Sequence, residues 1–140
     1  EESVCTACHS SGDAGYLAAR EIYTSLKNFV SVYDSAESRL KEVQKKGMDD
    51  VEILFLLQEA NQILIHSRTL THSFTPERIE EKTREGIEKS QQAITVAGMK
   101  ISDYYFRRRG FGIATLFITV LVIALFFRIR SMDKDKRKES

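Results

Sequence analysis

An uncharged run of 18 residues, from Gly110 to Phe127, limits most strongly what this chain can fold into. As an α-helix it would rise about 27 Å, close to the ~30 Å hydrocarbon core of a bilayer. Aromatic residues at 104–106 precede it, and arginines at 107–109, 128 and 130 stand on both sides, as at the ends of a membrane span. A buried helix of a soluble domain is the alternative, but basic flanks are unusual there. The sequence predicts a transmembrane helix over residues 107–130, followed by a charged tail over 131–140.

Basic residues near the run predict the orientation of this helix. Six follow it, at 128, 130, 134 and 136–138, and four precede it, at 100 and 107–109. The positive-inside rule therefore favours a cytoplasmic C-terminus in a single-pass protein. The chain opens with Glu1-Glu2-Ser3 and shows no signal peptide, so we expect a mature chain or the C-terminal piece of a longer exported protein.

The rest of the chain has the composition of long helices. One proline and seven glycines in 140 residues are too few for the turns of an all-β fold. Apolar residues recur every three or four positions, which predicts three helices over about 14–46, 50–72 and 76–106. The expected fold is all-α: an N-terminal loop over 1–13, an antiparallel three-helix bundle over 14–106, and a last helix that continues into the membrane.

Local signals mark the helix ends. Asp13 is a candidate N-cap of the first helix, and Gly47 follows its basic last turn as a C′ glycine. Asp49 or Asp50 opens the second helix, and Thr75-Pro76-Glu77 opens the third. The second helix is apolar on nearly every side over its first half, so we expect it to be buried between its neighbours.

The pentapeptide Cys5-Thr6-Ala7-Cys8-His9 is the motif that carries chemistry. CxxCH is the attachment signature of c-type haem, in which two thiols bond to the porphyrin vinyl groups and the histidine binds the iron. A zinc site would need a fourth ligand, and a thioredoxin-like dithiol would need neighbouring strands. The motif uses the only two cysteines of the chain, which disfavours a chance match. We expect one covalently attached haem c, held by Cys5, Cys8 and His9.

Compartment and partner class follow from these features. Haem c is attached after export, which agrees with the orientation given by the basic tail. We therefore expect a protein of the bacterial cytoplasmic membrane, with a periplasmic N-terminal domain. The formal net charge of +1 does not favour a nucleic-acid partner. Residues arranged as a hydrolase triad, a phosphate-binding loop or an acid–base carboxylate pair are not evident in the sequence.

CTACH, the segment HSFTPE from His72 to Glu77, the RRRG before the apolar run and the RIR after it together resemble the C-terminal portion of bacterial membrane-anchored multihaem c-type cytochromes. The resemblance implies electron transfer between haem proteins, alone or as a subunit of an oxidoreductase complex, and no catalysis on a small substrate. Such proteins usually carry several CxxCH motifs, and this chain has one. The alternative function is a non-redox, membrane-tethered helical interaction module, monomeric or oligomeric, in which CTACH is incidental.

The expected topology also suggests a second axial ligand for the iron. Two chain reversals would bring the start of the first helix, the end of the second and the start of the third to one end of the bundle. We therefore expect His72 to be the distal ligand, with His66, about 9 Å lower along the axis, as second choice. About thirty helical residues between Pro76 and Arg107 would hold this haem roughly 45 Å above the bilayer. The expected partner is therefore another haem protein rather than a quinol in the membrane.

Overall fold

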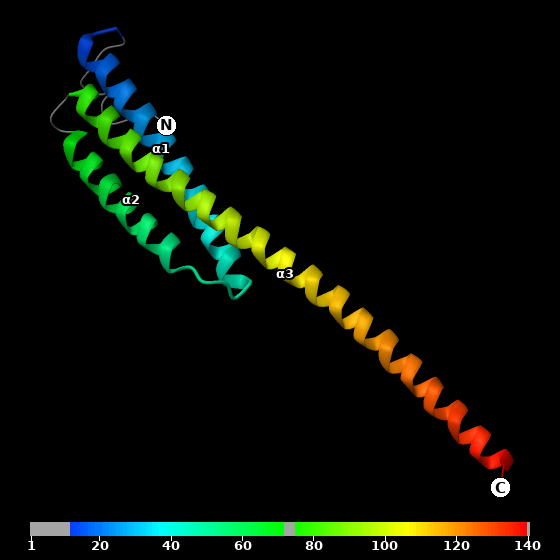
Figure 1. Ribbon diagram of the computed structural model, residues 1–140. Helices are drawn as coiled ribbons and strands as arrows, with labels where there is room; N and C mark the ends of the chain where they lie inside the picture. The colour runs from blue at the N-terminus through cyan, green and yellow to red at the C-terminus, as the bar shows by residue number, and fades with distance from the viewer. Residues whose placement is uncertain (1–11, 72–74, 140) are drawn as a thin grey trace. The chain divides into compact units, whose positions relative to one another are not determined.

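Most of the described part of the chain is helical. The computed structural model describes residues 12–71 and 75–139, and their side chains as far as Arg130 (Figure 1). These residues form α1 (Ala14–Lys45), α2 (Val51–Leu70) and α3 (Pro76–Glu139), with no strand among them. The expected all-α class, with three helices and a long apolar last helix, is confirmed for this part of the chain.

Chain contacts divide the molecule into two units. The N-terminal unit comprises Glu1–Ile101 and the C-terminal unit comprises Ser102–Ser140. The N-terminal unit contains α1, α2 and the first part of α3, and the C-terminal unit contains the rest of α3. The features that bear on a binding site lie in the first, and the apolar run lies in the second.

The turn between α1 and α2 is closed by hydrogen bonds that depend on a glycine. Gly47 has a φ of 65°, in the left-handed region that side chains with a Cβ disfavour. Its N–H donates to the carbonyl of Gln44 at 2.9 Å, and the N–H of Met48 donates to the carbonyl of Val43 at 3.2 Å. This pair of bonds is a Schellman motif, and Met48 packs against the core cluster that includes Val43. The predicted C′ role of Gly47 is confirmed.

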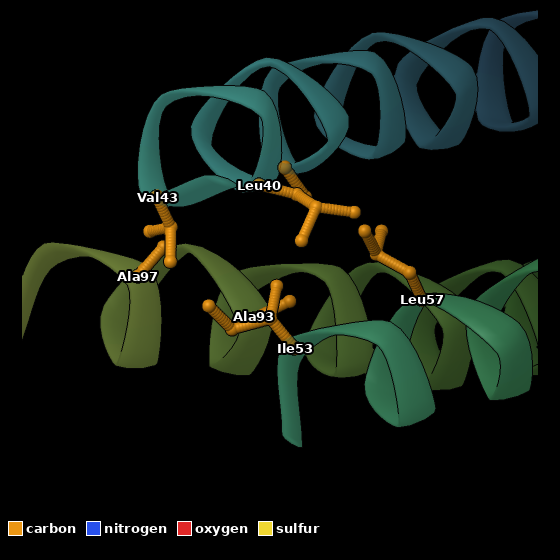
Figure 2. Close-up of a cluster of buried hydrophobic side chains, with 7 residues drawn as sticks. Leu40, Val43, Ile53, Leu57, Ala93 and Ala97 are labelled. Atoms are coloured by element: carbon orange, nitrogen blue, oxygen red, sulfur yellow. The ribbon is translucent and has the colours of Figure 1, made fainter. Parts of the chain in front are cut away.

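The core of the N-terminal unit is shared by all three helices. Figure 2 shows one cluster, in which α1, α2 and α3 each contribute side chains that point into the same space. Its fully or nearly fully buried members are Ala36, Leu40, Val43, Ile53, Leu57, Ala93 and Ala97. Alanines on α3 keep this helix close to α1 and α2, because they leave room for the larger residues opposite.

A second cluster lies further along the same helices. Phe29 of α1 and Ala60 of α2 are fully buried, Leu64 of α2 is nearly so, and Ile87 of α3 packs against them. A Cβ added at Gly86 would collide with the Phe29 ring, so this position of α3 accepts no larger residue unless the ring moves. The aromatic ring of α1 and the glycine of α3 therefore fit each other.

Two ion pairs give the relative directions of α2 and α3. Asp49, just before α2, pairs with Lys100 at 3.0 Å, whereas Glu59, ten residues later, pairs with the earlier Lys89 at 2.8 Å. The later residue on the α2 side therefore pairs with the earlier residue of α3. The two helices run in opposite directions.

We expected α2, apolar on nearly every side over its first half, to be buried between its neighbours, and the structure buries one of its faces only. Its buried residues are Ile53, Leu57, Ala60, Leu64 and Ser67, which form a single face. Apolar residues on the opposite face are exposed, with Val51 at 70%, Phe55 at 60% and Ile65 at 55% of their full accessible surface. Two neighbouring helices cover only one side of a third, so the second apolar face of α2 is left in solvent.

The part of α3 within the C-terminal unit contains the apolar run. The helix is long and apolar enough to cross a membrane, and none of the 18 most apolar consecutive residues is buried. Large apolar side chains from Phe111 to Ile129 lie on all sides of the helix. Such a surface suits lipid and does not suit water, so α3 contains one candidate membrane span.

Candidate functional site

The predicted haem residues Cys5, Cys8, His9 and His72 lie outside the described residues. The structure does describe the helix ends that flank them in the sequence. These are the start of α1, the end of α2 and the start of α3. The candidate site is therefore built from these three ends and from His66, the one predicted ligand with a described position.

The start of α1 is fixed by a side-chain cap. The Tyr16 N–H donates to the Asp13 carboxylate at 2.6 Å, and the Leu17 N–H donates to the Asp13 carbonyl at 3.1 Å. Gly12 precedes the cap with a φ of 111°, a conformation that glycine adopts readily. The predicted cap is confirmed. It sets the point where the segment that carries CxxCH joins the helical domain, four residues after His9.

The end of α2 lies between the two candidate distal ligands. The helix ends at Leu70, and Thr71 is its C-cap. The Thr71 hydroxyl donates to the Arg68 carbonyl at 2.7 Å, and the Thr69 hydroxyl donates to the His66 carbonyl at 2.7 Å. We expected α2 to continue to residue 72, but it ends two residues earlier. His66 lies within the helix, whereas His72 comes after its last residue in the sequence.

A shallow groove joins the starts of α1 and α3. It is lined by Leu17, Arg20 and Thr24 from the first turns of α1 and by Pro76 and Glu80 from the first two turns of α3. These residues belong to helix ends that are more than fifty positions apart in the sequence. The segment that carries CxxCH and the segment that carries His72 are thus attached at the same end of the N-terminal unit.

His66 faces a second groove, between α2 and α3. The histidine is exposed and lines this groove together with Ile63 of α2 and Lys82 and Glu85 of α3. Lys82 donates to Glu85 at 2.8 Å, and this hydrogen bond raises the pKa of the lysine above its usual value. In this groove the charges of Lys82 and Glu85 are therefore paired with each other, and the imidazole of His66 is exposed to solvent beside them.

Glu59 and Lys89 lie in the same groove. Their ion pair crosses from α2 to α3 at 2.8 Å, and the hydrogen bond from Lys89 to Glu59 is the largest cause that raises the pKa of this lysine. Three or more His, Cys, Asp or Glu side chains placed to hold a metal ion together were not found within the described ranges. Within the described part of the chain, His66 is thus a predicted ligand that does not belong to such a group.

Comparisons of the chain with protein-family models, with curated proteins and with solved structures found no match. The function must therefore be argued from the residues themselves. One surface feature was missed by the sequence reasoning, namely the exposed apolar face of α2. The signal was present: apolar residues occur on two opposite sides of this helix, and only one side can face two neighbours.

Proposed function

We propose that the protein is a membrane-anchored c-type cytochrome that transfers electrons between haem-protein partners outside the cytoplasmic membrane. The observation that carries the proposal is Cys5-Thr6-Ala7-Cys8-His9, which uses the only two cysteines of the chain. The chemistry of this donor set fits haem c. Cys5 and Cys8 would hold the porphyrin through two thioether bonds, and His9 would bind the iron. When bound, the haem supplies reversible one-electron exchange.

The described helix ends support His72 as the distal ligand. A chain spans at most about 3.6 Å per residue, so His9 lies within about 14 Å of Asp13. His72 is the residue directly after Thr71, so their Cα atoms are about 3.8 Å apart. The starts of α1 and α3 line one groove, which brings both attachment points to the same end. His66 lies four residues, or about 6 Å, back from the end of α2. It remains the second choice.

The proposed architecture is an antiparallel three-helix bundle with the CxxCH loop at one end and a single membrane span over residues 107–130. Opposite directions of α2 and α3 and a core shared by three helices support the bundle. The candidate span in α3 supports the anchor. The excess of basic residues after the span favours a cytoplasmic C-terminus and a periplasmic N-terminal unit.

Covalent haem attachment tests this function directly. We expect the full chain, expressed with a cytochrome c maturation system, to keep a haem stain on a denaturing gel. The variant with Cys5→Ser and Cys8→Ser should lose the stain, because both thioether bonds are removed. The matched control, Ser35→Ala and Ser38→Ala on exposed positions of α1, should keep it.

A colourless full-length protein under these conditions would contradict the proposal. That result would favour the non-redox tethering module instead, since such a protein needs the helices and the anchor but no cofactor.

A further inference from the structure

We propose that one side of α3, directly before the apolar run, binds the headgroup of an anionic phospholipid. We call this side the arginine patch and define it by Tyr104, Tyr105, Arg108 and Arg109. This inference rests on the membrane anchor of the proposed function and does not need haem. It therefore holds equally for a cytochrome and for a tethering module.

The four residues of the arginine patch share one side of the helix. Successive residues of an α-helix are about 100° apart around its axis, so Arg108 lies beside Tyr104 and Arg109 lies beside Tyr105. The Arg108 guanidinium donates to the Tyr104 hydroxyl at 3.3 Å. The rings of Tyr104 and Tyr105 meet edge to face, with their centroids 5.5 Å apart. These contacts hold two phenols and a guanidinium together on the patch.

The charges of the three consecutive arginines are not balanced equally. Arg107 forms an ion pair with Asp103, one turn earlier. Arg108 has a neutral phenol as its partner, and Arg109 has neither an ion pair nor a side-chain hydrogen bond within the described part of the chain. All three arginines are exposed. Two adjacent positive charges of the patch are therefore left without a countercharge among the residues that the structure describes.

The position of the arginine patch along α3 indicates what supplies this countercharge. Arg109 is followed directly by Gly110, the first residue of the uncharged run, and this run belongs to the candidate span. When the run lies in hydrocarbon, the turn before it lies at the depth of the lipid headgroups. A phospholipid headgroup therefore adjoins the patch, and its acyl chains meet the exposed apolar side chains from Phe111 onward.

Charge decides which class of phospholipid fits. A guanidinium binds phosphate through two parallel N–H···O bonds, and phenols favour the same interface. A zwitterionic headgroup also carries an ammonium group, which two adjacent guanidinium groups repel. A headgroup with a net negative charge, such as that of phosphatidylglycerol, brings no such repulsion. We therefore commit to an anionic phospholipid.

An anionic lipid also accounts for arginines on the side of the membrane where they are disfavoured. In the proposed orientation, residues 107–109 lie on the periplasmic side, whereas basic residues usually concentrate on the cytoplasmic side. Asp103 balances the first of these arginines. The lipid headgroup would balance the other two.

Site-specific photo-crosslinking of the full chain to lipid tests the inference. The photo-reactive residue p-benzoylphenylalanine replaces Gly112, which follows Arg108 by four positions and Arg109 by three and so lies on their side of the helix. A Cβ at Gly112 meets no atom within 4 Å, so a side chain can be placed there. The protein is reconstituted in vesicles that contain equal amounts of phosphatidylglycerol and phosphatidylcholine with identical acyl chains. Mass spectrometry then identifies the lipid in each adduct.

We expect phosphatidylglycerol adducts at position 112 to exceed phosphatidylcholine adducts at least about fivefold, the factor that corresponds to about 1 kcal/mol from one arginine at an anionic surface. Position 114 is the control. Ala114 is exposed, lies about two turns after the ion-paired Arg107, and faces the opposite side of the helix from position 112. The two lipids should form adducts there in nearly equal amounts.

Two variants make the test specific to the arginine patch. Arg108→Gln with Arg109→Gln should lower the lipid ratio at position 112 to the ratio at position 114. The matched variant, Arg107→Gln with Asp103→Asn, removes an ion pair without changing the net charge and should leave the ratio unchanged. Excess inorganic phosphate at constant ionic strength should also leave it unchanged, because the headgroup is held in place by its own membrane.

Three results would overturn the inference and leave the membrane anchor intact. These are equal lipid ratios at positions 112 and 114, a ratio at position 112 that survives Arg108→Gln with Arg109→Gln, and a ratio that inorganic phosphate abolishes. The absence of lipid adducts at both positions would overturn the anchor as well. Each result can be scored whether or not the protein binds haem.

Discussion

His66 and His72 are six residues apart, and the end of α2 falls between them. His66 is held in the helix and is exposed beside Lys82 and Glu85 of α3. His72 follows Thr71, whose hydroxyl caps the last turn by donating to the Arg68 carbonyl. The helix end therefore separates two residues that the sequence placed in one predicted helix over 50–72.

The distal-ligand proposal leads to a spectroscopic prediction. His72→Ala should convert a low-spin, bis-histidine haem spectrum to a high-spin one, because the iron loses one of its two imidazoles. His66→Ala is the matched control and should leave the spectrum low-spin. Absorption and electron paramagnetic resonance spectra of the purified haem protein would measure both. The opposite pattern would identify His66 as the ligand.

Single residues at the helix ends were the most predictable part of the structure. Asp13 caps α1 and Gly47 closes it, as the sequence predicted. Both roles depend on bonds within three to five residues, so neighbouring sequence suffices to identify them. The Asp49 and Asp50 pair was less clear. Asp50 occupies the cap position of α2 without a side-chain cap bond, whereas Asp49 accepts from the Val51 N–H at 3.4 Å.

At the scale of elements, α2 is tied to α3 by charge as well as by the core. Lys100 donates to the Asp49 carboxylate at 3.0 Å, across 51 positions of sequence. This bond, with the Val51 N–H, holds the pKa of Asp49 below its usual 3.8. A carboxyl whose pKa is lower in the folded state than in the unfolded state stabilises the folded protein. This stabilisation is fully present at pH values above the unfolded-state pKa. That stabilisation is lost as the pH falls through the lower, folded-state value.

The predicted consequence concerns unfolding in acid. As the pH falls from the usual carboxyl pKa of 3.8 toward the lower, folded-state value, the free energy of unfolding should fall less steeply for Asp49→Asn than for the unaltered chain, because the amide does not titrate. Urea unfolding followed by circular dichroism at several pH values would measure this. Ser38→Ala, at an exposed position of α1, removes no titrating group and is the control that should keep the original slope. Equal slopes for Asp49→Asn and the unaltered protein would show that the ion pair does not act in solution.

At the scale of the whole molecule, the chain has two units with different surroundings. The N-terminal unit buries a core of mostly small and aliphatic residues and presents charged α1 and α3 faces to water. The C-terminal unit exposes an apolar helix surface from Phe111 to Ile129. The N-terminal unit suits water and the apolar helix surface of the C-terminal unit suits lipid. The proposed membrane anchoring places each of them in those surroundings.

The proposed orientation can be tested with protease. Trypsin added to intact spheroplasts should remove the N-terminal unit and leave a C-terminal epitope tag attached to a protected fragment that begins near Arg107. Lysis should then expose the tag to digestion, because the tail contains several lysines and arginines. Loss of the tag before lysis would reverse the orientation, and it would also argue against haem attachment, since the CxxCH segment would then be cytoplasmic.

The sequence by itself determined the all-α class, the number of helices, the caps at Asp13 and Gly47 and the apolar run in α3. These features depend on local hydrogen bonds and on the hydropathy of consecutive residues, and both can be read along the chain. Only the tertiary structure decided which face of α2 is buried, which salt bridges join it to α3 and that Gly86 meets Phe29. The physical reason is that α2 carries apolar residues on opposite sides. The choice between these sides is made by neighbours that are distant in the sequence.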